Sequence, residues 1–308
     1  MKRNLIAAIA ILLAVPSLAQ DAAPVDTSWK RSGLVGINFT QVNLSNWAAG
    51  GENSFAGMAM FKYAANYNDG KNTWDNMIDL AYGLTQKGDE SPIKSDDKID
   101  LSTKYGRYAF KHWYYSALLG FKSQFTAGYN YPNDSVEISN FMAPAYITLA
   151  LGMDYKPSDA FTMLVAPLTG RIILVNDQNL ADAGAFGVDP AQFDLLGNKI
   201  SDGENLRYEF GAFLKAEYKK DILENVNFST KLELFSNYID EPQNVDVNWE
   251  TAFSMKVNKY ITATLSTQLI YDDNTIINID KNDDGIIDES GPRTQFKEVL
   301  GIGLAYKF

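Results

Sequence analysis

The chain has 308 residues, no cysteine and a formal net charge of -11, and 46% of its residues are hydrophobic. Without cysteine, neither a disulfide framework nor a lipid anchor on cysteine is available. The negative charge argues against a basic surface for nucleic acid, so we expect no nucleic acid partner. Aromatic residues make up 13% of the chain, which is too many for a disordered protein.

The first 20 residues have the pattern of a secretory signal peptide. A basic start precedes the apolar run Leu5 to Val15, and small residues follow, so cleavage is expected after Ala19. Residues 21–31 are expected to form a short periplasmic lead, and residues 32–308 a single domain. No later segment has the roughly 18 consecutive apolar residues that a membrane-spanning helix needs.

From residue 32 onward, apolar and polar residues alternate in short segments. Successive side chains of a strand point to opposite faces, so this period of two predicts β-strands. We expect about twelve, at residues 32–39, 55–67, 74–85, 98–105, 113–124, 145–155, 161–175, 206–218, 226–238, 245–256, 261–271 and 294–308.

The second and third segments are predicted to form a hairpin. The residues between them, 68–73, contain an Asp-Gly pair, which favours a tight turn. If Tyr67 lies opposite Trp74, then Lys62 lies opposite Asp79. The hairpin would therefore carry two aromatic residues at one end and an ion pair on its polar face.

The seventh segment, residues 161–175, contains a proline. Pro167 and Arg171 fall on one face of the alternation, and we place this face toward the polar side of the sheet. Proline cannot donate to a ladder, so a bulge or an irregular strand is expected there.

The breaks between the segments alternate in length. Those after odd-numbered segments are longer on the whole, and those after even-numbered segments are tight. An even number of strands, loops sorted in this way and apolar-out, polar-in alternation are typical of bacterial transmembrane barrels. We therefore predict an all-β fold, a transmembrane antiparallel up-and-down β-barrel of about 12 strands, with both termini in the periplasm.

The polar faces would then line an enclosed lumen. One interpretation is a path for small polar solutes, and the other is a cross-linked interior that fills the barrel, because about twelve strands lie between filled barrels and water channels. Mixed signs argue against a selector for one ion charge. The residues expected in the lumen are Lys62, Asp75, Asp79, Lys98, Asp100, Lys104, Lys122, Arg171, Arg207, Glu209, Lys215, Glu217, Lys231, Glu233, Asp246, Glu250 and Lys256.

The last segment, residues 294–308, places apolar side chains on one face and ends on Phe308, two residues after Tyr306. It resembles the C-terminal closing strand of bacterial outer-membrane barrels. That resemblance implies recognition of the strand by the barrel-insertion machinery of the outer membrane.

Four further stretches resemble a family of outer-membrane barrels from the Bacteroidota whose function is unknown. They read WAAGGENS at 47–54, WDNMIDLAYG at 74–83, KSDDKIDLS at 94–102 and PRTQFKEVLG at 292–301. The resemblance implies a barrel fold and a location in the outer membrane of a Gram-negative cell, in contact with its lipid. It brings no catalytic residues, and it leaves envelope protein partners open.

The last long break contains half of a calcium-binding motif, DKNDDGIIDE at 280–289. The twelfth position of the motif is Gly291 instead of glutamate, although Glu289 is available as a replacement. Two interpretations stay open, a weak calcium site and a solvated acidic turn, and no other cofactor is expected. The calcium ligands would be Asp280, Asn282, Asp284, Ile286 and Asp288.

The chain has one histidine, His112, which we assign to a tight turn at the periplasmic rim. Barrel hydrolases use histidine as a base. Because His112 would lie far from any serine or aspartate cluster on the outer face, we expect no enzyme. The function favoured is an integral outer-membrane barrel acting as a passive channel for small polar solutes. The alternatives are a non-catalytic structural or partner-binding subunit of a larger outer-membrane assembly and, less favoured, a lipid-modifying barrel enzyme.

Overall fold

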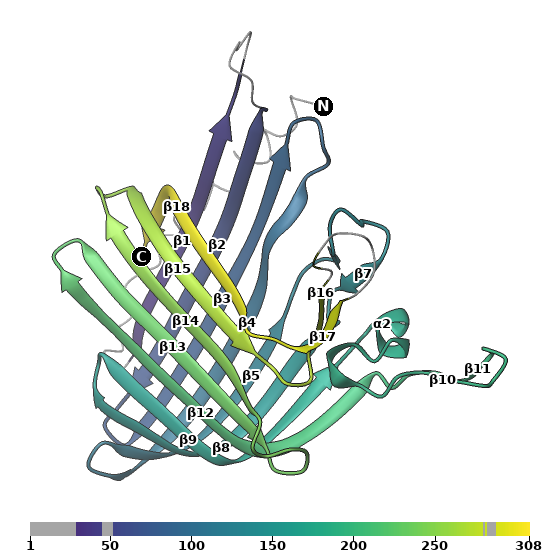
Figure 1. Cartoon of the computed structure of the whole chain (residues 1–308). Coiled ribbons are helices and arrows are strands. Elements are labelled where there is room, and N and C mark those ends of the chain that lie inside the picture. Colours follow the sequence, from purple (N-terminus) through teal and green to yellow (C-terminus); the bar gives the residue numbers. More distant parts are fainter. Residues whose placement is uncertain (1–28, 45–51, 280, 282–287) are drawn as a thin grey trace, which may run out of the picture.

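The computed structural model of the chain describes residues 29–44, 52–279, 281 and 288–308. Within them, twelve antiparallel strands form a closed barrel (Figure 1), as the alternation predicts. Each strand pairs with the barrel strands before and after it, and β1 pairs with β18 to close the sheet. The barrel strands are β1 (Trp29–Val42), β2 (Ser54–Asn68), β3 (Asn72–Lys87), β4 (Ile93–Phe110), β5 (Trp113–Ser123), β8 (Ala145–Ser158), β9 (Phe161–Leu174), β12 (Leu206–Leu223), β13 (Val226–Asn237), β14 (Val245–Lys256), β15 (Ile261–Tyr271) and β18 (Gln295–Lys307).

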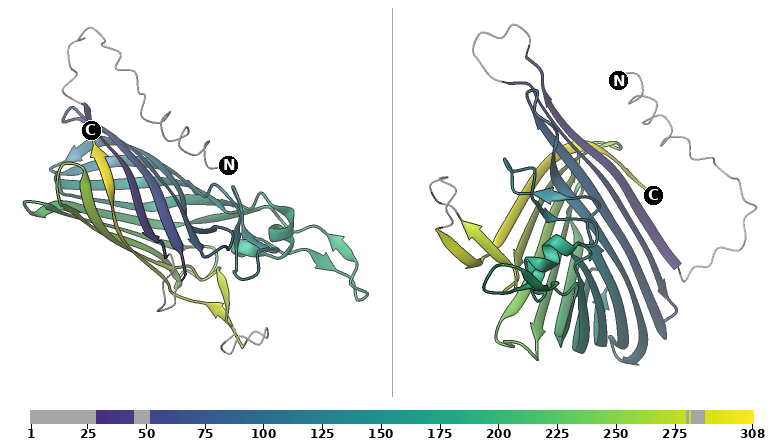
Figure 2. Two further views of the ribbon diagram at one scale, coloured as in Figure 1. Left: turned by 90° about the horizontal axis from the view of Figure 1, so that it is seen from above. Right: turned by 90° about the vertical axis from the view of Figure 1, so that its right-hand side faces the viewer.

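The long connections gather at one end of the barrel and the short turns at the other (Figure 2). The part of the chain that the structure describes contains no helix long and apolar enough to span a membrane. The smaller elements all lie in the long connections. They are β6 (Gly128–Tyr129), β7 (Glu137–Ser139), α2 (Gln178–Asp182), η1 (Ala185–Gly187), β10 (Gln192–Phe193), β11 (Lys199–Ser201), β16 (Ile276–Ile279) and β17 (Glu289–Pro292).

The first strand begins earlier than expected. It starts at Trp29, so it includes the last residues of the segment expected to be a periplasmic lead. The reason is an aromatic cluster at the short-turn end. Trp29 pairs with Tyr67, and the centre of its ring lies 5.3 Å from that of Tyr67 and 5.9 Å from that of Trp74. These contacts extend the ladder toward the N-terminus.

The predicted register of the first hairpin is confirmed. Tyr67 lies opposite Trp74, and Lys62 lies opposite Asp79 with its Nζ 3.1 Å from Oδ2 of the carboxylate. The tight turn of residues 69–71 joins the two strands. Because one register pair determines all the others along a ladder, the turn places every side chain of β2 and β3.

A bulge in β9 is confirmed, but the orientation expected for Pro167 is wrong. The register against both neighbouring strands shifts between Val165 and Thr169. Pro167 and Leu168 are both exposed, whereas Ala166 and Thr169 are buried inside. The extra residue of the bulge turns Pro167, which has no N–H for the ladder, to the outside and restores the inward direction of the residues that follow.

The outer surface of the barrel is apolar. On β18, the six apolar and aromatic side chains from Phe296 to Phe308 are all exposed, as their alternation predicts. Other strands expose similar residues, among them Phe39 of β1 and Trp249 of β14. A soluble protein rarely shows so continuous an apolar surface, so this surface requires a nonaqueous neighbour.

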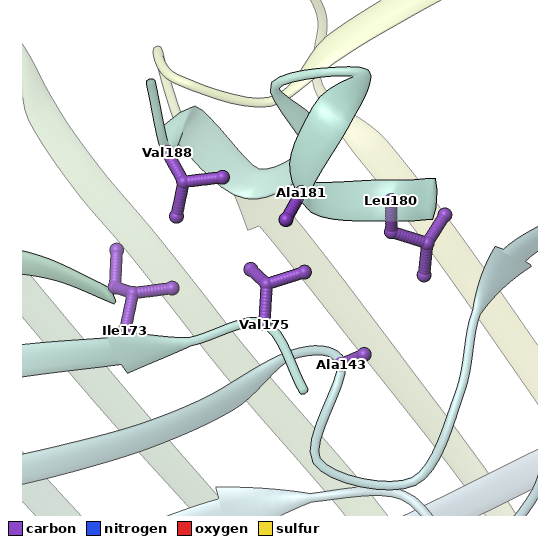
Figure 3. Packing of buried hydrophobic residues seen from close by; sticks show 6 residues of the cluster. All are labelled: Ala143, Ile173, Val175, Leu180, Ala181 and Val188. Carbon is purple, nitrogen blue, oxygen red and sulfur yellow. The ribbon is translucent and has the colours of Figure 1, made fainter. Parts of the chain in front are cut away.

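One long connection folds over the end of the barrel. Figure 3 shows Leu180 and Ala181 of α2 directed toward Val175 and Ala143, at the ends of the strands below. All four side chains are buried. The helix therefore caps the rim beside β8 and β9 instead of extending freely into solvent. We name residues 175–205, between β9 and β12, the capping connection.

The close packing at the bulge gives a test of the fold. A Cβ at Gly152 would lie 2.1 Å from the carbonyl oxygen of Val165, whereas a Cβ at Gly170 would meet nothing within 4 Å. Gly152→Ala is therefore expected to lower the free energy of unfolding by about 3 kcal/mol, and Gly170→Ala to change it by less than about 0.5 kcal/mol. Urea titration of the refolded barrel measures both, and equal effects would contradict the packing described.

Candidate functional site

Ion pairs join opposite walls of the barrel. Lys98 of β4 lies with its Nζ 3.0 Å from Asp79 of β3 and 2.9 Å from Glu250 of β14. Strands β4 and β14 are six ladders apart in either direction around the barrel, so they are diametrically opposite. A single lysine side chain thus bridges the lumen.

Further pairs reinforce this bridge. Lys231 of β13 lies 2.9 Å from both Asp100 of β4 and Glu250 of β14. Lys122 of β5 pairs with Glu233 of β13, another cross-lumen contact. Positive and negative groups alternate through the set, so the charges largely neutralise one another. We name Lys98, Lys231, Asp79, Asp100 and Glu250 the cross-lumen cluster.

Another group of charges lies closer to the short turns. Lys104 of β4 approaches Asp154 of β8 to 2.8 Å and Asp75 of β3 to 3.6 Å. Lys156 pairs with Asp75 as well. Thr162 donates a hydrogen bond from its hydroxyl to Oδ1 of Asp154 at 2.9 Å, whereas Oδ2 of this buried carboxylate is held by ion pairs with lysines and accepts no hydrogen bond within the described residues.

At the long-loop end, two arginines hold the interior. Arg171 pairs with Glu209 and Asp246, and its guanidinium carbon lies 4.1 Å from the ring centre of Phe235. Arg207 lies 3.1 Å from Glu209 and donates a 2.8 Å hydrogen bond to the carbonyl of Gly187 in the capping connection. Only about 20 Å³ of space remains beside Arg171 and Asp246.

One side of the lumen is filled by apolar side chains. Leu118, Ala150, Leu164 and Ala166, from β5, β8 and β9, form a buried cluster against which Phe213 of β12 packs. This cluster is not predicted from the sequence, because its residues stand on strand faces whose other members are mostly polar. Their positions in the alternation were the available signal.

The remaining space includes a cavity of about 850 Å³ that is lined by charged, polar and apolar side chains. It extends from the short turns, at Lys30, Lys156 and Tyr218, to Asp96 and Lys297 on the far side of the cross-lumen cluster. Strands β1 to β4 and β14 to β18 supply much of its lining, including three methionines. The lumen therefore contains a volume large enough for a small molecule.

The structure places the residues expected in the lumen as follows. Eight of the residues predicted to line the lumen border the large cavity, namely Lys62, Asp75, Asp79, Lys98, Lys104, Lys215, Lys231 and Glu250. Six others do not border this cavity and are held in ion pairs, namely Asp100, Lys122, Arg171, Arg207, Glu209 and Glu233. Glu217 lines the cavity, Asp246 the small space, and Lys256 is exposed at the end of β14.

Two partners were not identified from the sequence. Asp154 and Lys156 were read as strand end and turn, yet β8 continues through Ser158 and both side chains join the charged group near the short turns. Asp154 stands at an inward position of the alternation, and this was the signal for it.

The calcium hypothesis falls largely outside the described residues, because Asp280, Asn282, Asp284 and Ile286 are not among them. Asp288 accepts a 2.7 Å hydrogen bond from the backbone N–H of Lys281. Glu289 accepts from Lys281 and Arg293, and these bonds lower the pKa of its carboxyl. The calcium site therefore stays a prediction.

His112 lies in the tight turn between β4 and β5 and is exposed. Its ring centre is 6.3 Å from that of Tyr155. In the described part of the chain, its side chain forms no hydrogen bond or ion pair, so no serine or carboxylate is oriented by it.

The free energy of unfolding should respond to loss of a cross-lumen partner. Lys231→Met leaves Asp100, whose side chain is 4% exposed, without its nearest cation, and is expected to cost about 3 kcal/mol. The control is Lys30→Met, because Lys30 and Asp159 form an exposed pair that should contribute less than about 1 kcal/mol. If denaturant titrations show a similarly small loss of unfolding free energy for both variants, Lys231 does not stabilise the buried Asp100 carboxylate.

The capping connection should open at low pH. Hydrogen bonds from Lys199, the Gly203 N–H and Gln178 lower the pKa of Asp182 to about 2. A lowered pKa stabilises the fold above the ordinary value near 3.8, and this contribution is lost as the pH falls through about 2. Hydrogen exchange is expected to show a protected Gly203 amide at pH 5 that loses protection near pH 2. Asp182→Ala should lack the protection at both pH values, and Asp202→Ala should retain it at pH 5; pH-independent protection in the unmodified chain would contradict the assignment.

Comparisons with known proteins do not identify a function. Residues 39–129 match a family described as protein of unknown function (DUF3078). No significant match was found among curated proteins. An outer-membrane channel from Pseudomonas putida F1 has a TM-score of 0.38 and 11% identity, with 94% of this chain and 100% of that chain covered.

Two other solved structures are similar to a comparable extent. The translocator domain of the autotransporter NalP from Neisseria meningitidis has a TM-score of 0.37 and 8% identity, covering 99% of this chain and 96% of that one. Outer membrane phospholipase A from Escherichia coli has a TM-score of 0.35 and 12% identity, with 94% of each chain covered. Barrels with several different functions are therefore among the chains that this protein resembles.

Proposed function

We propose that this protein is an integral outer-membrane β-barrel whose lumen is a gated passage for small polar solutes, closed in the conformation described. Both termini would lie in the periplasm, and residues 1–20, outside the described residues, would be removed as a signal peptide. The exposed apolar face of β18 and its neighbours supports the membrane location, because such a surface suits lipid. The gathering of Trp29, Tyr67 and Trp74 near the short turns is typical of an interfacial aromatic belt.

The observation that carries the proposal is the bridge made by Lys98. Its contacts with Asp79 and Glu250 join opposite walls beside the cavity of about 850 Å³. A cavity that holds small solutes but is crossed by ion pairs favours a gate over a permanently open pore. Lysine side chains are flexible, so a change in their pairing alters the width of the path without breaking any ladder.

The cavity also supports this proposal over a purely structural role. An interior that only stabilises the barrel has no need of an open volume lined by Lys62, Lys98 and Glu250. We further propose that the protein is not an enzyme, because His112 is exposed at the short turns and has no catalytic partner among the described residues. His112→Ala is accordingly expected to leave the conductance of the barrel in lipid bilayers unchanged.

Conductance in planar lipid bilayers tests the gate. The unmodified barrel is expected to be closed for most of the recording. Lys98→Ser removes the bridging side chain and should raise the time-averaged conductance several-fold. Lys98→Arg retains the charge and the reach, so its conductance should stay close to that of the unmodified barrel.

The control for charge alone is Lys256→Ser, because Lys256 is exposed at a strand end. It should leave the conductance unchanged. Higher KCl concentration should increase the open fraction of the unmodified barrel, since salt screens the partly hydrated pairs. If the unmodified barrel and Lys98→Ser both stay closed while folded in the bilayer, the passage is wrong and a structural or partner-binding role is supported.

A further inference from the structure

The ladder that closes the barrel, between β1 and β18, is shorter than every other. It pairs residues 34–38 with residues 303–307, and two backbone hydrogen bonds also join Gly33 to Phe308. Each of the other eleven barrel ladders contains ten or more residue pairs. Strands β1 and β18 lie side by side near the C-terminus (Figure 2).

Beyond this ladder, both strands continue without pairing to each other within the described residues. Strand β1 runs on to Val42 and is paired with β2 along its other edge. Strand β18 reaches back to Gln295 and is paired with β15 along its other edge. The stretches 39–42 and 299–302, which would be partners if the same register continued, therefore each present one edge to a gap between them. We name this gap the seam opening.

The seam opening lies in an apolar part of the outer surface. Phe39 beside it is 59% exposed, and Leu300 and Ile302 are 70% and 63% exposed. An unpaired backbone amide or carbonyl in hydrocarbon costs several kcal/mol. In a membrane, these unpaired backbone groups therefore need hydrogen-bond partners, which water or a ligand can supply from inside the barrel.

The large cavity of the lumen lies directly behind the seam opening. Asn38 of β1 and Val299 of β18 both line it. The Asn38 side chain occupies the space beside Gly301 and Gly303, where a Cβ would lie 2.7 Å and 2.2 Å from its amide atoms. The glycines of β18 thus make room for the Asn38 side chain, which lies across the wall where the ladder ends.

The inward side chains of β2 change in character with distance from the seam opening. Phe39, the first unpaired residue of β1, lies opposite Gly57. The inward-facing residues that follow Gly57 along β2 are Met58, Met60 and Lys62, in that order. The Lys62 side chain is 54% exposed, so it remains accessible although it pairs with Asp79. Apolar thioethers therefore lie near the seam opening and a cation lies deeper.

We propose that the seam opening is a lateral entrance from the membrane and that the cavity binds an anionic single-chain amphiphile of the fatty acid class. The acyl chain passes the seam opening and contacts Met58 and Met60, and the carboxylate pairs with Lys62. Methionine suits this role because its flexible side chain adapts to an alkyl chain. The inference rests on the proposed membrane location, but not on conductance.

Disulfide formation tests the seam opening, and the chain has no cysteine of its own. Ile37 and Leu304 are ladder partners, so Ile37→Cys with Leu304→Cys is expected to form a disulfide on oxidation. Gln41 and Leu300 would be partners if the same register continued. Gln41→Cys with Leu300→Cys is expected to stay reduced, and cross-linking as complete as in the first pair would show that the seam is closed.

Photocross-linking tests the ligand in vesicles of phosphatidylethanolamine and phosphatidylglycerol that contain radiolabelled palmitic acid. Benzoylphenylalanine in place of inward Met58 should capture the fatty acid, and so should the same residue in place of exposed Ala59, the outward neighbour. Lys62→Ala should reduce capture at position 58 several-fold and leave capture at position 59 unchanged. Lys30→Ala, at another cation of the cavity, is the matched control and should change neither.

A short bismaleimide between Gln41→Cys and Leu300→Cys closes the lateral route. Capture at position 58 should then fall to background, while capture at position 59 stays. If position 59 captures palmitic acid but position 58 does not, or if closure has no effect at position 58, the lateral entrance is wrong. Absence of capture at both positions would instead show that the barrel is not in lipid, so the proposed location would fail.

Discussion

The barrel depends on the pairing of every strand edge with another strand. In hydrocarbon no water replaces a missing backbone partner, so a sheet must close on itself. Eleven long ladders meet this requirement, and they connect strands that are neighbours in the chain. The twelfth joins the two ends of the barrel and ends at Asn38 and Gly303. The same constraint that requires closure therefore makes the unpaired continuation of β1 and β18 chemically significant.

The interior obeys a different constraint. Twelve strands enclose more space than an eight-stranded barrel, whose side chains just fill it. In this protein, apolar side chains around Leu164 fill the side formed by β5, β8, β9 and β12, and lysines such as Lys98 cross the rest. Buried charges are costly to hold without partners, which explains why cations and carboxylates alternate through the cluster. The cavity is the volume that these two arrangements leave open.

The capping connection is held by contacts that are separate from the strand ladders of the barrel. The ladders carry the barrel, whereas α2 rests on Val175 and is held by Asp182 and Lys199 outside the ladders. Contacts of this kind open locally at a smaller free energy than a barrel strand does. The long-loop end can therefore change conformation while the wall of the barrel stays intact.

Alternation along the sequence was enough to predict the strand number, the sorting of the loops and the pairing of Lys62 with Asp79, because each depends on residues close in the chain or on a period of two. The outward turn of Pro167 required the bulge itself, since one inserted residue reverses the alternation. The contact between Lys98 and Glu250, the apolar cluster and the short closing ladder were decided only by the tertiary structure. They depend on how far the sheet curves and which strands it brings face to face, and no local pattern records the distance between opposite walls.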